Sequence, residues 1–233
     1  MIKIEFLYPE ACNLFGDTFN IKYLEKCLGE NVKIIKTGLT ERPAFVEEDI
    51  NLIYIGPMTE KMQEIVINKL KPYKEKIEEL IEKNVLFLSI GNSLEVFGKY
   101  IENEDKSKIE ALGIFDIYAK RQMFNRHNST FLGKYEDIEI MGFKSQFTFC
   151  YGNIEDIYFA KVEKGIGLNP ESKLEGIQKN NFIGTYVIGP LLVLNPLFTK
   201  KILKKLGIED TKLIFEDTAQ KAYNQRLQEL KKI

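Results

Sequence analysis

Short strand-like runs alternate with segments of helical periodicity over the first part of the chain, and this alternation constrains the fold more than any other feature. Residues 2–7 alternate apolar and charged side chains, and residues 52–55 and 85–90 are almost wholly apolar. Such runs are typical of strands, and strands that alternate with helices form a mainly parallel sheet covered by helices. We therefore expect an α/β fold with a mixed, mainly parallel central sheet flanked by helices.

The segments between these runs have the spacing of helices. Ile21, Leu24 and Leu28 recur at helical intervals up to Gly29, and a second strand is expected at residues 32–35. Residues 59–82 carry a longer helical pattern that Pro72 interrupts. Residues 196–206 and 216–232 are expected to close the chain as two more helices.

The second half of the chain changes character, because short strand-like segments replace the strand–helix alternation. We expect these segments to extend the same sheet, and they are residues 131–135, 138–143, 147–151, 157–162 and 182–187. No linker, internal repeat or low-complexity tract divides the chain. A single domain over residues 1–233 is the resulting prediction.

Charge and hydropathy exclude several classes of protein. The chain has 33 Lys and Arg against 34 Asp and Glu, for a formal net charge of −1, so no basic field attracts a polyanion. The longest apolar runs fall far short of the about 20 residues that a membrane-spanning helix needs, and the N-terminus does not resemble a signal peptide. We expect no nucleic-acid partner, no membrane insertion and a cytoplasmic location.

Cysteine and histidine usage limits metal and redox chemistry. Cys12, Cys27 and Cys150 form no CxxC pair, and His127 is the only histidine. Neither a disulfide framework nor a zinc site is indicated by this pattern. We expect no metal and no cofactor.

Five ordered segments carry a recognisable pattern over nearly the whole chain. They are Leu7-Tyr8-Pro9-Glu10 with residues 13–17 and Asn20, residues 55–60, residues 90–100, residues 142–148, and residues 184–192 with Asn195-Pro196. The set resembles the GatD-type glutaminase subunits of lipid II isoglutaminyl synthases and the related cobyric acid synthase (CobB/CobQ-type) amidotransferase domains. The last segment is the fullest match, to G-T-Y-L-H-G-P-L-L-x-x-N-P. This resemblance implies a class I glutamine amidotransferase-like fold, a flavodoxin-like three-layer arrangement.

The resemblance also implies where the catalytic groups of such an enzyme would stand. In that family a cysteine on a strand-to-helix turn attacks the amide of glutamine, a histidine acts as its base, and a synthetase receives the ammonia. The nucleophile position corresponds to Gly91 and the histidine position to Ile188. Glycine cannot form a thioester and isoleucine cannot take a proton, and removing one such group alone lowers kcat by on the order of 10⁶. We therefore expect a catalytically inactive chain.

Other positions of the family's site are changed or only partly kept. Pro57 stands in a loop that in the family supplies backbone N–H groups to the reacting carbonyl, and proline has no N–H to donate. Arg121 and Asn125 have the spacing of the family's R-x-x-G-N, in which the arginine is implicated in holding glutamine. The resemblance thus gives Gly56, Arg121 and Asn125 as candidate substrate-binding residues.

The main prediction for function is a non-catalytic subunit or scaffold. Its expected partner is a Mur-ligase-like or other ATP-dependent amide synthetase, in a peptidoglycan-amidating, cobalamin-like or other pathway. One alternative is an active glutaminase with a relocated nucleophile, for which Cys12, in the loop after the first strand, is the first candidate. A serine elbow at Gly91-x-Ser93 is another, although Glu95 replaces its final glycine. A third is a module that binds glutamine or another small amino acid without turnover.

Overall fold

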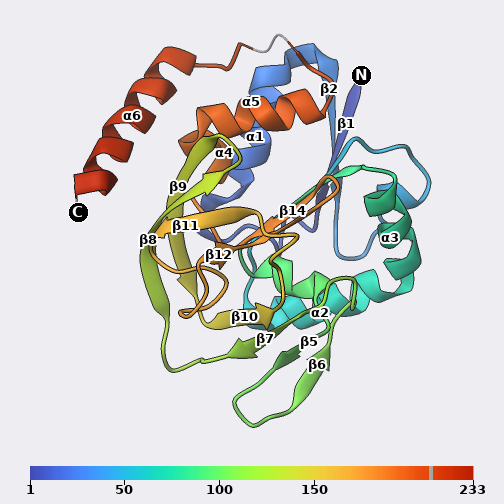
Figure 1. The fold of residues 1–233 in the computed structure, drawn as a ribbon. Helices are drawn as coiled ribbons and strands as arrows, with labels where there is room; N and C mark the ends of the chain where they lie inside the picture. The colour runs from blue at the N-terminus through green and yellow to red at the C-terminus, as the bar shows by residue number, and fades with distance from the viewer. Residues whose placement is uncertain (210–211, 233) are drawn as a thin grey trace.

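A computed structural model of the protein describes residues 1–209 and 212–232, and its chain winds around a central sheet (Figure 1). Within the described residues this sheet has six strands in the order β13-β14-β4-β3-β1-β2. Their bounds are β1 Ile2–Leu7, β2 Val32–Thr37, β3 Leu52–Ile55, β4 Leu86–Ile90, β13 Ile177–Lys179 and β14 Phe182–Thr185. All neighbours pair in parallel except β13 and β14, which confirms the mixed, mainly parallel sheet.

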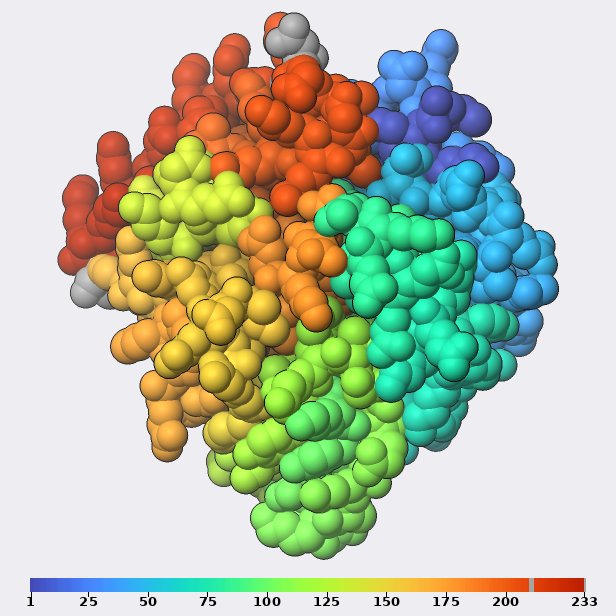
Figure 2. All heavy atoms as spheres, turned by 45° about the vertical axis from the view of Figure 1, so that its right-hand side comes forward, coloured from blue at the N-terminus to red at the C-terminus, as the bar shows by residue number. Residues whose placement is uncertain are grey.

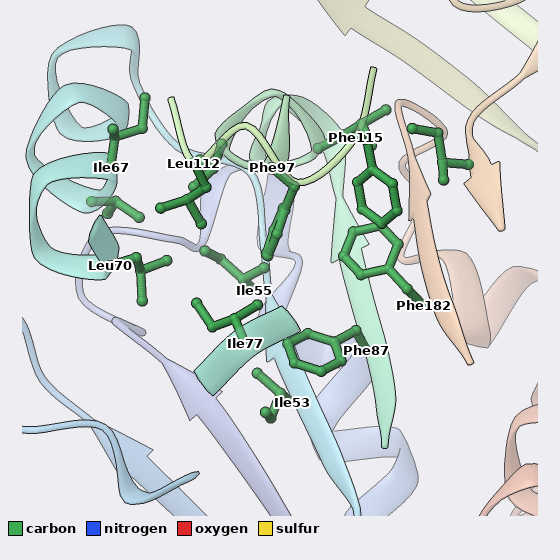
Figure 3. Close-up of a cluster of buried hydrophobic side chains, with 14 of the residues drawn as sticks. Ile53, Ile55, Ile67, Leu70, Ile77, Phe87, Phe97, Leu112, Phe115 and Phe182 are labelled. Atoms are coloured by element: carbon green, nitrogen blue, oxygen red, sulfur yellow. The ribbon is translucent and has the colours of Figure 1, made fainter. Parts of the chain in front are cut away.

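Helices cover both faces of the sheet because the strands bury side chains on both faces. Ile53 and Ile55 of β3 join one hydrophobic cluster with α2 (Glu60–Leu70) and α3 (Lys74–Glu82), as Figure 3 shows. Leu52 and Tyr54 belong to a second cluster on the opposite face. That face is covered by α1 Thr18–Leu28, α4 Leu191–Leu194 and α5 Pro196–Lys205. The period-2 alternation of strand side chains thus produces the expected three layers.

Short helices mark the turns between these elements. A 3-10 helix, η4 (Lys71–Tyr73), separates α2 from α3 at Pro72, as the interrupted pattern predicted. The other short helices are η1 Leu14–Gly16, η2 Gly29–Asn31, η3 Ala44–Val46 and η5 Gly91–Phe97.

The second-half strands do not simply extend the central sheet, and this part of the prediction is wrong. Only β13 and β14 join it, and the others form two smaller sheets, β10-β7-β5-β6 and β12-β11-β8-β9. Their bounds are β5 Tyr100–Glu102, β6 Lys108–Glu110, β7 Ile117–Arg121, β8 His127–Tyr135, β9 Ile138–Gln146, β10 Thr148–Gly152, β11 Ala160–Lys164 and β12 Leu174–Glu175. Strands such as β8 alternate exposed and buried residues over part of their length, which suits a sheet with one solvated face.

Two peripheral elements project from this body. The β5–β6 hairpin protrudes at the bottom of Figures 1 and 2. The last helix, α6 (Glu216–Lys232), lies at the edge of the molecule and packs Tyr223 and Leu230 against Leu132 and Met141 (Figure 1). No helix among residues 1–209 and 212–232 is long and apolar enough to cross a membrane.

Candidate functional site

A cavity of about 280 Å³ opens beside the carboxyl ends of β3 and β4. This edge of a parallel sheet is where α/β folds place their ligand sites. The loops after β1, β3 and β4, the β9–β10 connection and the segment after β14 all line it, through residues that include Phe15, Pro57, Gly91, Gln146 and Ile188. The structure therefore brings Gly91 and Ile188, the two positions that the resemblance predicted for the catalytic pair, into one cavity.

Gly91 turns the chain from β4 into η5, with a positive φ of 67°. This left-handed conformation is one that glycine adopts without strain. A Cβ at this position would lie 2.6 Å from Cβ of Pro57, closer than two non-bonded carbon atoms approach in proteins. The cavity thus lacks a nucleophile at this turn, and Pro57 also occupies the space that the side chain of a nucleophile would need.

In the loop that follows β3, the backbone groups of Met58 form hydrogen bonds within the protein. Pro57 has no N–H, and the N–H of Met58 donates to Oδ1 of Asn92 at 3.0 Å. The Asn92 side chain also donates to the Met58 carbonyl at 2.8 Å. An oxyanion needs free donors aimed at the reacting oxygen. Neither Pro57 nor Met58 supplies one in this arrangement.

The position opposite Gly91 is aliphatic. Ile188 is buried and pairs with Phe143 of β9 through two backbone hydrogen bonds, of 3.1 and 2.9 Å. His127, the only histidine of the chain, lies at the start of β8, 2.9 Å from the Ser129 hydroxyl, and does not line the cavity. No imidazole is therefore available to a nucleophile in the cavity.

Cys12, the first candidate for a relocated nucleophile, is fully buried in the cluster beneath α2. Its Sγ lies 3.9 Å from Sδ of Met58, and it does not line the cavity. Burial raises the pKa of this thiol far above its usual value, and the nearby carboxyl groups of Glu10 and Asp17 raise it further. A thiolate at Cys12 is therefore strongly disfavoured, so the structure does not support the relocated nucleophile.

Ser93 does not form a serine elbow. Its hydroxyl is buried and lies 2.8 Å from the Ile90 carbonyl, 3.1 Å from the Ile55 carbonyl and 2.7 Å from the Ser89 hydroxyl. The side chain points into the fold and does not line the cavity. Its role is to hold the turn after β4 against β3.

The three candidate substrate-binding residues lie outside the cavity lining. Arg121 is buried, and its guanidinium donates to Glu64 at 3.0 Å, to Gln63 at 3.0 Å and to the Glu60 carbonyl at 3.2 Å, all in α2. Asn125 is exposed in the turn before β8. A Cβ on Gly56 would lie 2.5 Å from the Cys12 carbonyl, so this glycine permits a close loop contact. None of the three residues is therefore placed to contact a molecule bound in this cavity.

Two polar residues that the sequence reasoning did not single out do line the cavity. Arg126 is exposed and lies over the rings of Phe147 and Phe15, at 4.9 and 5.8 Å from their centroids. No carboxylate of the described residues forms an ion pair with it. Gln146 is 6% exposed and donates to the Thr148 carbonyl, but its Oε1 has no partner among the described residues. Arg126 follows Asn125 directly, so the cavity-lining arginine lies in the same stretch as the predicted residues Arg121 and Asn125.

A buried hydrogen-bond network adjoins the cavity through Tyr186. The Tyr186 hydroxyl lies 2.8 Å from Glu95 and 3.1 Å from Sγ of Cys150, and Gln63 donates to Glu95 at 2.8 Å. Burial raises the pKa of Glu95 to about 7, although the hydrogen bonds from Tyr186 and Gln63 lower it in part. Among the described residues, no group of three or more His, Cys, Asp or Glu side chains is placed to hold a metal ion.

The cavity loops fall within the segment that matches a known family. A profile of the CobB/CobQ-like glutamine amidotransferase domain matches residues 3–195. The chain belongs to this family. The resemblance carried by the five sequence segments is thereby confirmed.

Two curated relatives are similar over most of the chain. The lipid II isoglutaminyl synthase (glutamine-hydrolysing) subunit GatD of Staphylococcus aureus is 28% identical over 206 residues, which cover 88% of this chain and 84% of that protein. Its namesake from Streptococcus pneumoniae is 27% identical over 231 residues, which cover 93% of this chain and 86% of that protein. Both are subunits of a synthase by name.

Solved structures of glutamine amidotransferases share the fold. One superposes with a TM-score of 0.57 at 12% identity, covering 87% of this chain and 98% of that one. Another, from Thermotoga maritima, has a TM-score of 0.53 at 12% identity and covers 96% of this chain and 92% of that one. The likeness confirms the class I glutamine amidotransferase-like fold.

Proposed function

We propose that this chain is a non-catalytic glutamine amidotransferase-like subunit that supports an ATP-dependent amide synthetase without hydrolysing glutamine. One observation carries the proposal: Gly91 presents bare backbone to the cavity, and Cβ of Pro57 lies 2.6 Å from where the Cβ of a nucleophile would stand. Ile188 and the engaged N–H of Met58 support it, because they remove the base and an oxyanion donor as well. The names of the GatD relatives make a synthetase subunit the natural partner.

The same chemistry argues against an active glutaminase. Glutamine hydrolysis by this family's route needs a nucleophile, a base and a stabilised oxyanion together. Hydroxyl groups do line the cavity, at Thr59, Ser145, Thr148 and Tyr186, but no histidine accompanies them. The Ser145 hydroxyl donates to Asn128, and Tyr186 is bonded to Glu95.

We also propose that residues 1–233 form a single domain. Segments far apart in the sequence interlock, since the Asn20 side chain accepts from the N–H of Leu192 at 2.8 Å. Asn195 likewise binds both backbone groups of Met141.

The direct test measures glutamate formation from glutamine, by the purified chain alone and together with a co-expressed Mur-ligase-like synthetase of its host. We expect no hydrolysis above the buffer background in either case, and a complex that survives size-exclusion chromatography. Glutamate release at the rate of an active GatD-type enzyme would overturn the assignment as non-catalytic. A chain that elutes only as a monomer in the presence of the synthetase would overturn the subunit role.

One observation favours a second function, the binding of a small amino acid without turnover. The cavity combines an exposed guanidinium, on Arg126, with the unpartnered Oε1 of the buried Gln146. Arginine suits a carboxylate and the amide oxygen suits an N–H donor. Glutamine or glutamate at tenfold its Kd would stabilise the fold by about 1.4 kcal/mol, equivalent to roughly 3–5 °C in Tm. Arg126→Ala should abolish the shift and Arg226→Ala, on α6, should keep it; no shift with either amino acid at millimolar concentration rejects this second function.

A further inference from the structure

A second hollow, which we call the α1–α6 groove, lies between those two helices. It has a volume of about 1080 Å³, and α4 contributes Val193 and Leu194 to its lining. None of its lining residues is shared with the cavity beside Gly91. Binding in the α1–α6 groove is therefore independent of whether the chain hydrolyses glutamine.

The two walls of the groove are each anchored to the body of the protein. The Tyr223 hydroxyl of α6 donates to the Glu139 carbonyl at 2.8 Å, and Lys164 donates to the Leu230 carbonyl at 2.5 Å. On the α1 wall, the Tyr23 hydroxyl donates to the Ile214 carbonyl at 3.2 Å. Leu24 and Leu28 of α1 are buried on the central sheet. The groove is thus a feature of the fold that both helices keep open between them.

The lining is mainly apolar and includes large exposed aromatic side chains. Phe19 is 56% exposed and Phe215 is 75% exposed. Ala219 and Ala222 line the α6 wall, where small side chains allow another backbone to approach closely. A contiguous apolar hollow of this kind on a protein surface typically marks a site of interaction.

Positive charges border the groove on both walls. Lys22 and Lys26 of α1 and Arg226 of α6 line it, and Glu229 is the single acidic residue that does. Lys22 lies 5.0 Å from the ring centroid of Phe19, and none of the three cations forms an ion pair with a carboxylate of the described residues. A complementary occupant is apolar on one side and acidic along both edges.

We propose that the α1–α6 groove binds an amphipathic α-helix of a protein partner, with apolar residues facing α4 and Glu or Asp residues along its flanks. Each wall offers residues at helical spacing, such as Phe19, Lys22 and Lys26 on α1, and the ridges of a third helix pack between such rows. The cations lie on both walls, whereas a fatty acid or lipid needs its cation at one end, beside the headgroup. These two features favour an acidic helix over an acyl chain.

The absence of tryptophan from the chain provides a direct binding assay. The probe is a synthetic amphipathic peptide of about 18 residues, some five helical turns, with leucines and one tryptophan on its apolar face and glutamates on its flanks. Selective excitation of tryptophan then reports on the peptide alone. We expect a saturable blue shift that weakens as salt is added, and binding at least roughly tenfold weaker for a peptide with lysines in place of the glutamates.

Charge-reversal variants locate the binding site. Lys22→Glu, Lys26→Glu and Arg226→Glu together should weaken binding of the glutamate peptide at least roughly tenfold, because three attractions become repulsions. The matched control reverses three exposed lysines on and beside α2, Lys61, Lys69 and Lys71, which gives the same net charge. This control should bind the peptide like the unmodified chain, and circular dichroism checks the folding of both variants.

Four results would each overturn the proposal. They are no binding of the glutamate peptide, equal binding of both peptides, equal loss in the groove and control variants, and saturable binding of oleate where the glutamate peptide does not bind. A dimer of this chain in sedimentation velocity that the groove variant abolishes and the control variant keeps would assign the groove to a second copy, and would also overturn it.

Discussion

Two residues from separate loops, Gly91 and Pro57, lie against each other in the wall of the cavity. The resemblance predicted that the nucleophile is absent, because Gly91 stands where the cysteine of the family is expected. It did not predict that a Cβ at Gly91 would meet Pro57 at 2.6 Å, because that contact joins loops that follow different strands. A cysteine side chain at Gly91 would therefore meet Pro57, so adding that side chain alone should not give an active site.

This contact predicts the outcome of an attempted repair. Gly91→Cys with Ile188→His should give no measurable glutaminase and should lower the free energy of unfolding by about 1–3 kcal/mol, since the new Cβ overpacks against Pro57. Adding Pro57→Gly removes the contact and returns a backbone N–H, so the triple variant should regain only the part of the stability lost to the contact, since the positive φ at position 91 still strains a cysteine. Glutamate release and urea unfolding measure the two effects. Glutamine hydrolysis by the double variant would contradict this account of the turn.

The thiols offer a second prediction for single residues. Burial raises the pKa of all three thiols, but Cys12 and Cys150 are fully buried whereas Cys27, in α1, is only half-buried. In the native protein an aromatic disulfide reagent should therefore modify Cys27 first, and should modify Cys12 and Cys150 only in urea. Mass spectrometry of the labelled peptides identifies the order, with Cys27→Ser as the control. Rapid modification of Cys12 in the native protein would support Cys12 as a relocated nucleophile.

Arginine placement illustrates what sequence spacing cannot settle. Arg121 and Arg126 lie in the same polar stretch, and the family's pattern pointed to Arg121. In the structure Arg121 ends β7 and donates to α2, whereas Arg126 follows the turn and reaches the cavity. Which arginine faces the cavity depends on where β7 ends and on which way its last side chain points. Neither is encoded in the local pattern.

Elements buried on both faces were predictable, and elements with one solvated face were harder to place. β3 and β4 were identified from their short apolar runs and β1 from its alternation of apolar and charged side chains, and Pro72 marked the break between α2 and α3. The segments of β8 and β9 were also recognised as strands, but their partners were not. They pair with each other over nine residues, from His127 with Gln146 to Tyr135 with Ile138. Strand pairing is a long-range choice that period-2 alternation does not specify.

Asn195, which precedes α5, connects two of these elements. Its Oδ1 accepts from the N–H of Met141 in β9, and its Nδ2 donates to the carbonyls of Met141 and Leu191, each at 2.8 Å. Asn195→Ala would leave buried backbone groups without partners, so the free energy of unfolding should fall by about 2–4 kcal/mol. Asn224→Ala, which removes only an exposed side-chain bond on α6, should change it by less than about 0.5 kcal/mol. Equal losses in urea unfolding would refute the role given to Asn195.

At the scale of the whole molecule, one buried network connects the central sheet to the smaller sheet that contains β7 and β10. Arg121 of β7 donates to Gln63 of α2, and Gln63 donates to Glu95 of η5. Glu95 in turn lies beside Tyr186, which follows β14 and contacts Cys150 of β10. The network explains why a carboxyl group is tolerated at full burial, since both of its oxygens are hydrogen-bonded. The free energy that burial of Glu95 costs depends on whether its carboxyl group is ionised.

The pKa of Glu95 predicts how the stability of the molecule varies with pH. Burial raises this pKa from 4.5 to about 7, so between these values the unfolded chain ionises Glu95 while the folded chain keeps it protonated. The contribution of Glu95 to the free energy of unfolding therefore falls by on the order of 3 kcal/mol as pH rises from about 4.5 to 7. Above pH about 7 this contribution is constant. Burial also raises the pKa of Asp17 to about 7. Asp17 therefore changes the stability with pH in the same direction, and it does so equally in the unmodified chain and in the variants.

Glu95→Gln removes this one ionisation and keeps the shape of the side chain. The variant should therefore gain stability over the unmodified chain as pH rises, with little difference at pH about 4.5 and an advantage on the order of 2–3 kcal/mol at pH about 8. Urea unfolding at the two pH values gives the comparison, and Glu229→Gln on the exposed face of α6 serves as the control. An advantage that is the same at both pH values would contradict the raised pKa, because it would mean that Glu95 has the same pKa in the folded and unfolded chain.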